Sequence, residues 1–312
     1  MKQFSEDVRA GLSKSPKTLP SKYFYNKKGD ELFIKIMGMP EYYLTRSEME
    51  IVQRKGSELV NALGFEQGQY FELIELGAGD GYKTKELLKV LLKEDYNFEY
   101  IPIDISPNVL NQLKANFNGG LPGLRMNAQA GDYFNILNDF KASEHPKVVL
   151  FLGSNIGNLT DEEAQEFIYK LGANLRARDK LILGVDLIKA QDIVLPAYND
   201  AAGITRDFNL NLLDRINTEL GADFDVAEFK HAPEYTEEEG IAKSYLESGR
   251  DQTVTIEGEQ FSFAKGERIH TEISRKYNDE VMTRILSNTD FIIADKFTDS
   301  KGYFADYVLE RQ

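Results

Sequence analysis

The segment with the clearest chemical potential is the glycine-rich run ELGAGDG at residues 75–81. It follows an apolar run typical of a buried strand and precedes a stretch with helical periodicity. A glycine loop at such a junction lets a ligand approach the backbone and the helix N-terminus closely. The glycines occupy positions i, i+2 and i+4, whereas the dinucleotide fingerprint requires i, i+2 and i+5. Taken alone this spacing is a weak signal, because three glycines can simply form a tight turn.

Two acidic residues stand where a nucleoside could be recognised. Asp104 ends the second predicted strand, where a carboxylate can accept hydrogen bonds from both ribose hydroxyls. Asp132 and Tyr133 follow a third predicted strand and offer an acid for an exocyclic amine beside an aromatic surface for a base. The combination of strand, glycine loop, helix and acid makes a nucleoside site the better interpretation of the loop.

A second polar turn, GSNIGN at residues 153–158, follows another apolar run. Thr160 and Glu163 have the spacing of a capping box, so a helix is expected to begin there. Its first amides and the positive end of its dipole would face the carboxyl ends of the strands. Asn158 could hold a substrate carboxylate or amine there, or it could only shape the turn, and the spacing leaves both interpretations open.

The stretch 269–275 alternates as a strand would, with His270, Glu272 and Ser274 on one face. Such a polar face is usually solvated, and alternation alone favours that interpretation. A carboxylate beside a hydroxyl could instead line a polar pocket.

The predicted strands and helices around these segments must position them. Apolar runs alternate with helical stretches between residues 71 and 186, which predicts a parallel sheet covered on both faces. Two further strand-like runs near the C-terminus are separated only by the turn at 298–302, so they are predicted to form an antiparallel hairpin added to the sheet. The predicted strands are 71–76, 100–105, 148–152, 180–186, 291–297 and 303–309, and the predicted helices are 84–93, 108–116, 161–176 and 279–287.

The alternation also predicts two domains. Residues 61–190 and 275–312 form the predicted nucleotide-binding domain. Residues 1–60, which are helical and rich in aromatics, and residues 191–274, which include a predicted hairpin around Gly258, do not fit the alternation. We assign them to a second, smaller domain.

The composition excludes several classes of function. The 312 residues carry 37 Lys plus Arg against 51 Asp plus Glu, a net charge of −14, which argues against binding DNA, RNA or an anionic membrane surface. The absence of cysteine excludes disulfides, thiolate metal sites and cysteine nucleophiles. No apolar run approaches the roughly 18 residues of a membrane span, and residues 1–12 lack the apolar core of a secretion signal. We therefore expect a cytoplasmic protein. No metal site is expected, because the three histidines are scattered, at His145, His231 and His270.

Several motifs together resemble one known family, the histidine-specific, S-adenosylmethionine-dependent Nα-methyltransferases of ergothioneine biosynthesis. The resemblance covers nearly the whole chain and is highly specific, above all in the segments around Tyr42 and Tyr198. The glycine loop, with Glu75 before it, resembles the S-adenosylmethionine loop of Rossmann-like methyltransferases. The other motifs are KYFY at 22–25, PEYYLTR at 40–46, DISP at 104–107, IGN at 156–158, YNDAAG at 198–203, ADFD at 222–225 and TEIS at 271–274.

The resemblance implies a Rossmann-like class I methyltransferase sheet with a smaller α+β domain for substrate recognition. It implies methylation of the α-amino group of L-histidine, through to the trimethylated betaine hercynine, with no dedicated catalytic side chain because the sulfonium is already an activated donor. The implied cofactor contacts are Tyr25, Gly77, Gly79, Lys83, Asp104, Asp132 and Tyr133. The implied substrate contacts are Asn158 and Tyr198 at the amino and carboxylate groups, and Tyr42, Glu272 and Ser274 around the imidazole.

Two positions depart from the pattern of the family. Ser244 stands where relatives carry a bulkier methionine beside the substrate, and Asn155 stands where they carry threonine. A smaller residue at 244 would enlarge the substrate site, so an α-N-methyltransferase for another amino acid or small amine is the main alternative. A nicotinamide-dependent oxidoreductase and a catalytically silent nucleoside-binding protein are alternatives of a different class.

Overall fold

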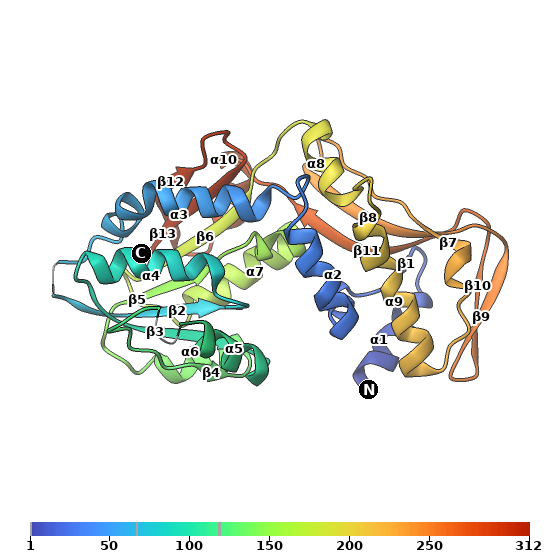
Figure 1. The fold of residues 1–312 in the computed structure, drawn as a ribbon, viewed down its shortest axis with the longest axis horizontal. Coiled ribbons are helices and arrows are strands. Elements are labelled where there is room, and N and C mark those ends of the chain that lie inside the picture. Colours follow the sequence, from blue (N-terminus) through green and yellow to red (C-terminus); the bar gives the residue numbers. More distant parts are fainter. Residues whose placement is uncertain (1, 67, 118–119) are drawn as a thin grey trace. The chain divides into compact units, whose positions relative to one another are not determined.

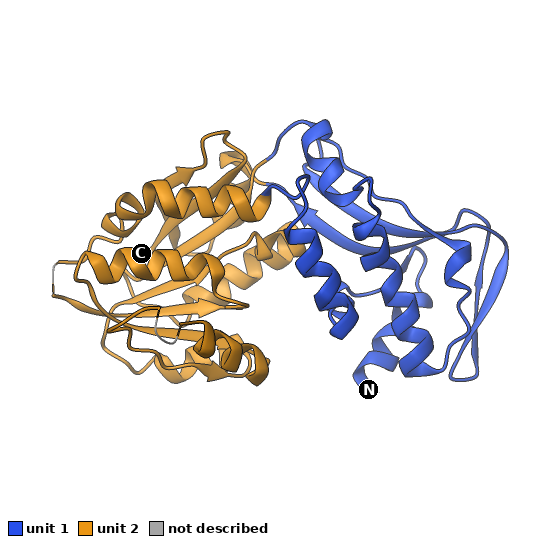
Figure 2. Cartoon of the chain, in the orientation of Figure 1, with its two compact units in different colours: residues 1–43, 188–276 blue, residues 44–187, 277–312 orange. Residues whose placement is uncertain are grey.

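The computed structural model describes residues 2–66, 68–117 and 120–312 (Figure 1). The chain divides into two compact units, unit 1 with residues 1–43 and 188–276 and unit 2 with residues 44–187 and 277–312 (Figure 2). The sequence-based division differs mainly at the first boundary, because it places residues 44–60 in the smaller domain. Helix α3 (Leu44–Asn61) instead belongs to unit 2, where it packs against helix α4 (Tyr82–Lys93) and strand β13 (Phe304–Arg311).

Unit 2 is built on a seven-stranded sheet in the order β12-β13-β6-β5-β2-β3-β4. The strands from β2 to β6 run parallel, and β13 pairs antiparallel with both β6 and β12. This confirms the predicted parallel sheet with a C-terminal antiparallel hairpin. The remaining bounds are β2 (Tyr70–Leu76), β3 (Asn97–Asp104), β4 (Gln129–Ala130), β5 (Lys147–Phe151), β6 (Lys180–Asp186) and β12 (Phe291–Thr298).

Helices cover the sheet of unit 2 on both faces. Every residue of β5 and β6 is buried, as expected for central parallel strands that read as continuous apolar runs. The capping box predicted at Thr160 is present, with the Thr160 hydroxyl and the Glu163 carboxylate each accepting a backbone amide at the start of α7. The other helices of this unit are α5 (Pro107–Phe117), α6 (Tyr133–Phe140), α7 (Asp161–Gly172) and α10 (Asp279–Leu286), with a short 3-10 helix at Asn155–Asn158.

Unit 1 is a smaller α+β unit around a four-stranded sheet in the order β1-β11-β8-β7 and a separate hairpin of β9 and β10. The hairpin lies within one residue of its predicted place. The strands are β1 (Lys17–Thr18), β7 (Phe229–His231), β8 (Ile241–Ser248), β9 (Gln252–Ile256), β10 (Glu259–Phe263) and β11 (Arg268–Arg275). The helices are α1 (Lys2–Leu12), α2 (Lys27–Met37), α8 (Gln191–Tyr198) and α9 (Ile204–Leu220), with 3-10 helices at Ser21–Phe24 and Val226–Glu228.

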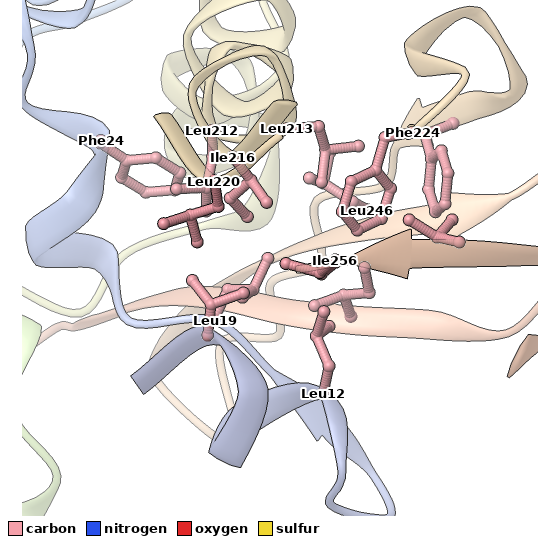
Figure 3. Close-up of a cluster of buried hydrophobic side chains, with 14 of the residues drawn as sticks. Leu12, Leu19, Phe24, Leu212, Leu213, Ile216, Leu220, Phe224, Leu246 and Ile256 are labelled. Atoms are coloured by element: carbon pink, nitrogen blue, oxygen red, sulfur yellow. The ribbon is translucent and has the colours of Figure 1, made fainter. Parts of the chain in front are cut away.

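An apolar core joins the parts of unit 1 that are distant in the sequence. Figure 3 shows Leu12 and Leu19 from the N-terminal segment near Leu212 and Ile216 of α9 and Leu246 of β8. These side chains are all at most 2% exposed. Residues near the N-terminus are therefore held to the 188–276 segment by the burial of apolar surface.

Strand β11 departs from the simple alternation expected for residues 269–275. A register shift between His270 and Glu272 in its pairing with β8 interrupts the two-residue period. Alternation alone favoured a solvated polar face, whereas the family resemblance implied that Glu272 and Ser274 line a site. Ser274 is only 6% exposed and Glu272 is half-buried, so this part of the face is not solvated. The bulge turns these side chains toward the neighbouring elements of unit 1.

Candidate active site

The glycine loop follows β2 at the point where the strand order of the sheet reverses, with β3 on one side of β2 and β5 on the other. Gly77, Gly79 and Gly81 all have positive φ, at 71°, 53° and 68°. A Cβ at Gly77 would lie 2.8 Å from the Tyr133 hydroxyl, and one at Gly81 would overlap Leu113. At Gly79 no described atom lies within 4 Å of that position. The loop is therefore tightly packed at both ends and open in the middle.

Gly81→Ala is expected to lower the free energy of unfolding by about 2–5 kcal/mol. The left-handed backbone costs about 1–2 kcal/mol, and forcing a methyl against Leu113 and Phe117 adds about 1–3 kcal/mol. Gly79→Ala is the matched control, because it carries the backbone cost alone. Urea denaturation of both variants measures the difference, and equal losses would contradict the packing assigned to Gly81.

Glu75, just before the loop, is buried and accepts hydrogen bonds from two neighbouring elements. Thr84 Oγ1 donates a hydrogen bond to Glu75 Oε1 at 2.5 Å, and the Tyr100 hydroxyl donates to Oε2. Burial raises the pKa of Glu75 to about 7, and these two hydroxyls partly oppose the rise. Glu75 thus ties the loop to the start of α4 and to β3, and it does not face a ligand.

The raised pKa of Glu75 predicts a pH dependence of stability. A carboxyl whose pKa is higher in the folded state makes the protein less stable as pH rises. The loss begins at the unfolded pKa of 4.5 and ends at the folded pKa of about 7. We expect this group to lower the free energy of unfolding by about 3 kcal/mol across that range. Denaturation of wild type and Glu75→Gln at several pH values tests this, because the glutamine cannot ionise. A variant that kept the full wild-type slope would refute the assignment.

Asp104 ends β3 beside the glycine loop. Its Oδ1 accepts the Ser106 amide at 2.9 Å, and its Oδ2 has no hydrogen bond to the described part of the chain. The next residue, Ile105, is 80% exposed. Ile105 belongs to the DISP motif, but the sequence predicted no role for it. A carboxylate oxygen and an apolar side chain thus lie together at the carboxyl end of β3.

Tyr133 and Asp132 stand at the start of α6, across the loop. Burial, together with the charges of the Asp104 and Asp132 carboxylates, raises the pKa of Tyr133 to about 12, so the phenol stays neutral. Asp132 Oδ1 caps α6 by accepting the amides of Phe134 and Asn135, each at 3.1 Å. Only its second oxygen is left for a ligand amine.

Lys83, on the first turn of α4, forms an ion pair with Glu48 of α3. The other Glu48 oxygen accepts the Gly153 amide at 2.7 Å. Asp306 of β13 is completely buried beside this pair, and burial together with the charge of Glu48 raises its pKa well above the usual range. Neither Glu48 nor Asp306 carried a signal in the sequence, because both reach Lys83 only through packing onto the sheet.

Asn158 and Asn155 lie in the short 3-10 helix after β5, also in unit 2. Asn155 Nδ2 donates to the Leu152 carbonyl at 2.9 Å. Asn158 is exposed, and within the described residues its side chain forms no hydrogen bond. Asn155 therefore shapes the turn, and Asn158 is available for a ligand.

The other predicted substrate residues gather in unit 1. The Tyr198 hydroxyl at the end of α8 donates to Ser274 Oγ of β11 at 2.8 Å. Glu272 pairs in register with Ser244 of β8, whose hydroxyl hydrogen-bonds to the Glu272 carboxylate. Burial raises the pKa of Glu272 to about 7, whereas Lys276 and Ser244 lower it. Lys276 was not singled out from the sequence, although it lies two residues beyond the TEIS motif.

Tyr25 and Tyr42 belong to an aromatic group in unit 1. Phe33 lies edge-on to both rings, with centroid distances of 5.6 Å to Tyr25 and 6.5 Å to Tyr42. The pKa of Tyr25 is raised by burial and then by the charge of Glu272. Tyr25 thus lies in unit 1 with the predicted substrate residues, and its predicted contact with the cofactor stays a prediction.

Two kinds of feature are absent from the part of the chain that the structure describes. Residues 2–66, 68–117 and 120–312 contain no cluster of three or more His, Asp or Glu side chains suited to a metal ion. Within the same ranges, none of the helices has the length and apolar character needed to cross a membrane.

The chain is an S-adenosylmethionine-dependent methyltransferase, as a family model over nearly its whole length shows. The strand order and the glycine loop at the switch point agree with this class. A crystal structure from Thermobifida fusca, described as a candidate methyltransferase, shares this fold with a TM-score of 0.50 at 9% identity, covering 97% of each chain. The protein belongs to one family within this class. A family model described as histidine-specific methyltransferase, SAM-dependent, matches residues 4–311.

Two bacterial relatives support the family assignment. The histidine N-alpha-methyltransferase of Mycolicibacterium smegmatis is 36% identical over 300 residues, covering 96% of this chain and 92% of the relative. The protein of the same name from Mycobacterium tuberculosis is 34% identical with the same coverage.

Proposed function

We propose that this enzyme transfers methyl groups from S-adenosylmethionine to the α-amino group of L-histidine, through to the trimethylated betaine hercynine. The observation that carries the proposal is the half-buried carboxylate of Glu272 beside the Ser274 and Tyr198 hydroxyls, in a chain of the histidine-specific family. The expected partner is a small amino acid and not a nucleic acid or a membrane, in keeping with the net charge of −14.

The residues at the carboxyl ends of the parallel strands of unit 2 fit the cofactor. When bound, S-adenosylmethionine supplies a methyl group activated by its sulfonium. The open middle of the loop at Gly79 admits a ligand against the backbone, and Asp104 Oδ2 is available for ribose hydroxyls. Ile105 and Tyr133 offer apolar surface for the base. The Lys83 ammonium carries three donors, so it can bind a ligand carboxylate while it keeps its ion pair with Glu48.

The proposed substrate residues form two groups, one for the amino and carboxylate groups of the amino acid and one for its side chain. Asn158 and Tyr198 would hold the carboxylate and the amine, and Glu272 with Ser274 would hold the imidazole. Glu272 accepting an imidazole N–H would discriminate against phenylalanine, because a site built for a polar group leaves its own groups unpaired when an apolar analogue binds. Tyr42 and Ser244 complete the surroundings of the ring.

No side chain is assigned as a dedicated base. The amine needs a free lone pair for each transfer, so activity is expected to rise with pH as the substrate ammonium deprotonates. The contribution of the protein is to bind, align and bring the reactants together.

Mass spectrometry of the purified enzyme incubated with S-adenosylmethionine and each of the twenty amino acids, in separate reactions, tests the proposal. Gains of one to three methyl groups on histidine alone are expected. Gains on a different amino acid would keep the chemistry but move the specificity, with the small Ser244 as the reason. No gain on any amino acid would overturn the proposed substrate class.

A further inference from the structure

Lys276 follows β11 as a fully buried ammonium group. Its Nζ donates hydrogen bonds to the Tyr198 hydroxyl at 2.7 Å and to Ser274 Oγ at 2.8 Å. The same nitrogen lies 4.7 Å from the centroid of the Tyr198 ring. Burying a charge costs free energy unless it is well paired, so a lysine kept at this position calls for a reason beyond packing.

The hydrogen bonds around Lys276 leave Ser274 with one role. An ammonium group has three donors and no acceptor, and a hydroxyl has one donor and two acceptor lone pairs. Ser274 Oγ accepts from both Lys276 and Tyr198, so its two lone pairs are occupied. Because both lone pairs are occupied, only the hydroxyl hydrogen of Ser274 is left for a bound substrate. Toward that substrate Ser274 acts as a hydrogen-bond donor.

The charge of Lys276 acts on the second polar group of the same site. Glu272 is faced by Lys276, by the Ser244 hydroxyl and by the Tyr25 phenol, and the Tyr25 phenol is in turn influenced by Asp30 and Tyr198. Lys276 is the cation among these groups, and it lowers the pKa of Glu272 against the effect of burial. Above its pKa of about 7 the Glu272 carboxylate is ionised and only accepts hydrogen bonds.

We propose that Lys276 is a positioning residue that sets the hydrogen-bond polarity of the substrate site, with Ser274 as a donor beside Glu272 as an acceptor. A ring that satisfies both groups has one nitrogen that accepts and one N–H that donates, which is the neutral form of imidazole. Imidazolium has two N–H donors and leaves Ser274 without an acceptor. This inference rests on the proposed function, because it assumes that Glu272 and Ser274 bind the side chain of the substrate.

The first test replaces Lys276 with methionine, which keeps the length of the side chain and removes the charge and the donors. Histidine binding is measured by calorimetry as a function of pH, so that deprotonation of the amine for transfer does not enter. We expect histidine affinity to fall about 10- to 100-fold, as for a lost charge-assisted hydrogen-bond network. The pH midpoint of binding should rise by about one unit or more, because a nearby cation lowers a carboxyl pKa by about 1–3 units. Affinity for S-adenosylmethionine should stay within about twofold.

Lys147→Met is the matched control. Lys147 is a buried lysine of unit 2, 1% exposed, which contacts Glu72 and the Ser143 and His145 carbonyls. This variant is expected to lose stability without moving the pH midpoint of histidine binding. An unchanged midpoint in Lys276→Met, or the same shift in both variants, would overturn the proposal.

A second measurement uses the wild-type protein and does not depend on the folding of a variant. Nitrogen NMR of bound histidine labelled in the ring should show one protonated and one unprotonated nitrogen at neutral pH. Two protonated nitrogens would overturn the role of Lys276 while leaving histidine methylation intact. Failure of the proposed function would appear separately, as histidine that is neither bound nor methylated.

Discussion

Replacing Glu272 with alanine is expected to remove most use of histidine and to leave cofactor binding nearly unchanged. The carboxylate is flanked by Lys276 and Ser244 in a largely desolvated part of unit 1. Truncating one partner of a buried, charged hydrogen bond costs about 2–5 kcal/mol. The kcat/KM for histidine should therefore fall about 30- to 5,000-fold.

The measurement is steady-state kinetics with histidine, together with calorimetric binding of S-adenosylmethionine. Glu247→Gln is the control, because Glu247 lies on β8 in the same sheet and pairs with the surface residue Arg268. Its loss should leave both quantities within about twofold, as for most exposed ion pairs. A parallel loss of histidine use and cofactor binding in Glu272→Ala, or no loss of either, would show that Glu272 has been assigned wrongly.

Asp104→Ala is expected to weaken S-adenosylmethionine binding about 10- to 200-fold. The structure leaves Asp104 Oδ2 available, and hydrogen bonds to a charged group contribute about 1.5–3 kcal/mol each. Removal of the side chain takes away the acceptor that we propose for the ribose hydroxyls. Stability should change little, because the only hydrogen bond lost by the side chain within the described residues is that from the Ser106 amide.

Glu99→Gln is the control for Asp104, because Glu99 lies nearer the start of the same strand, away from the carboxyl end. Calorimetric titration with S-adenosylmethionine compares the two variants. Unchanged affinity in Asp104→Ala, with the fold intact by circular dichroism, would remove Asp104 from the cofactor site.

Local patterns predicted the elements that depend on near neighbours. The capping box at Thr160 is present, and so is the C-terminal hairpin across residues 298–302. Alternation of apolar and helical runs also predicted the parallel sheet with its glycine loop after the first strand. In each of these cases the signal lies in a short stretch of sequence. There the spacing of apolar residues and the turn-forming residues determine the local structure directly.

Longer-range features were predicted wrongly or were missed. The boundary expected near residue 60 falls before α3, because that helix buries its face against unit 2. Alternation within β11 did not predict the register shift or the contact of Ser274 with Tyr198 and Lys276. Glu48 and Asp306 were not found, because their relation to Lys83 depends on how separate elements pack.

The sequence by itself predicted most strands and helices of unit 2, the glycine loop after its first strand and, through its motifs, the family. Only the tertiary structure decided which polar groups meet, because that depends on strand register and on packing between residues far apart in the chain. Lys276 illustrates the difference: it lies two residues beyond the TEIS motif, but its contacts with Tyr198 and Ser274 exist only once α8 has packed beside β11.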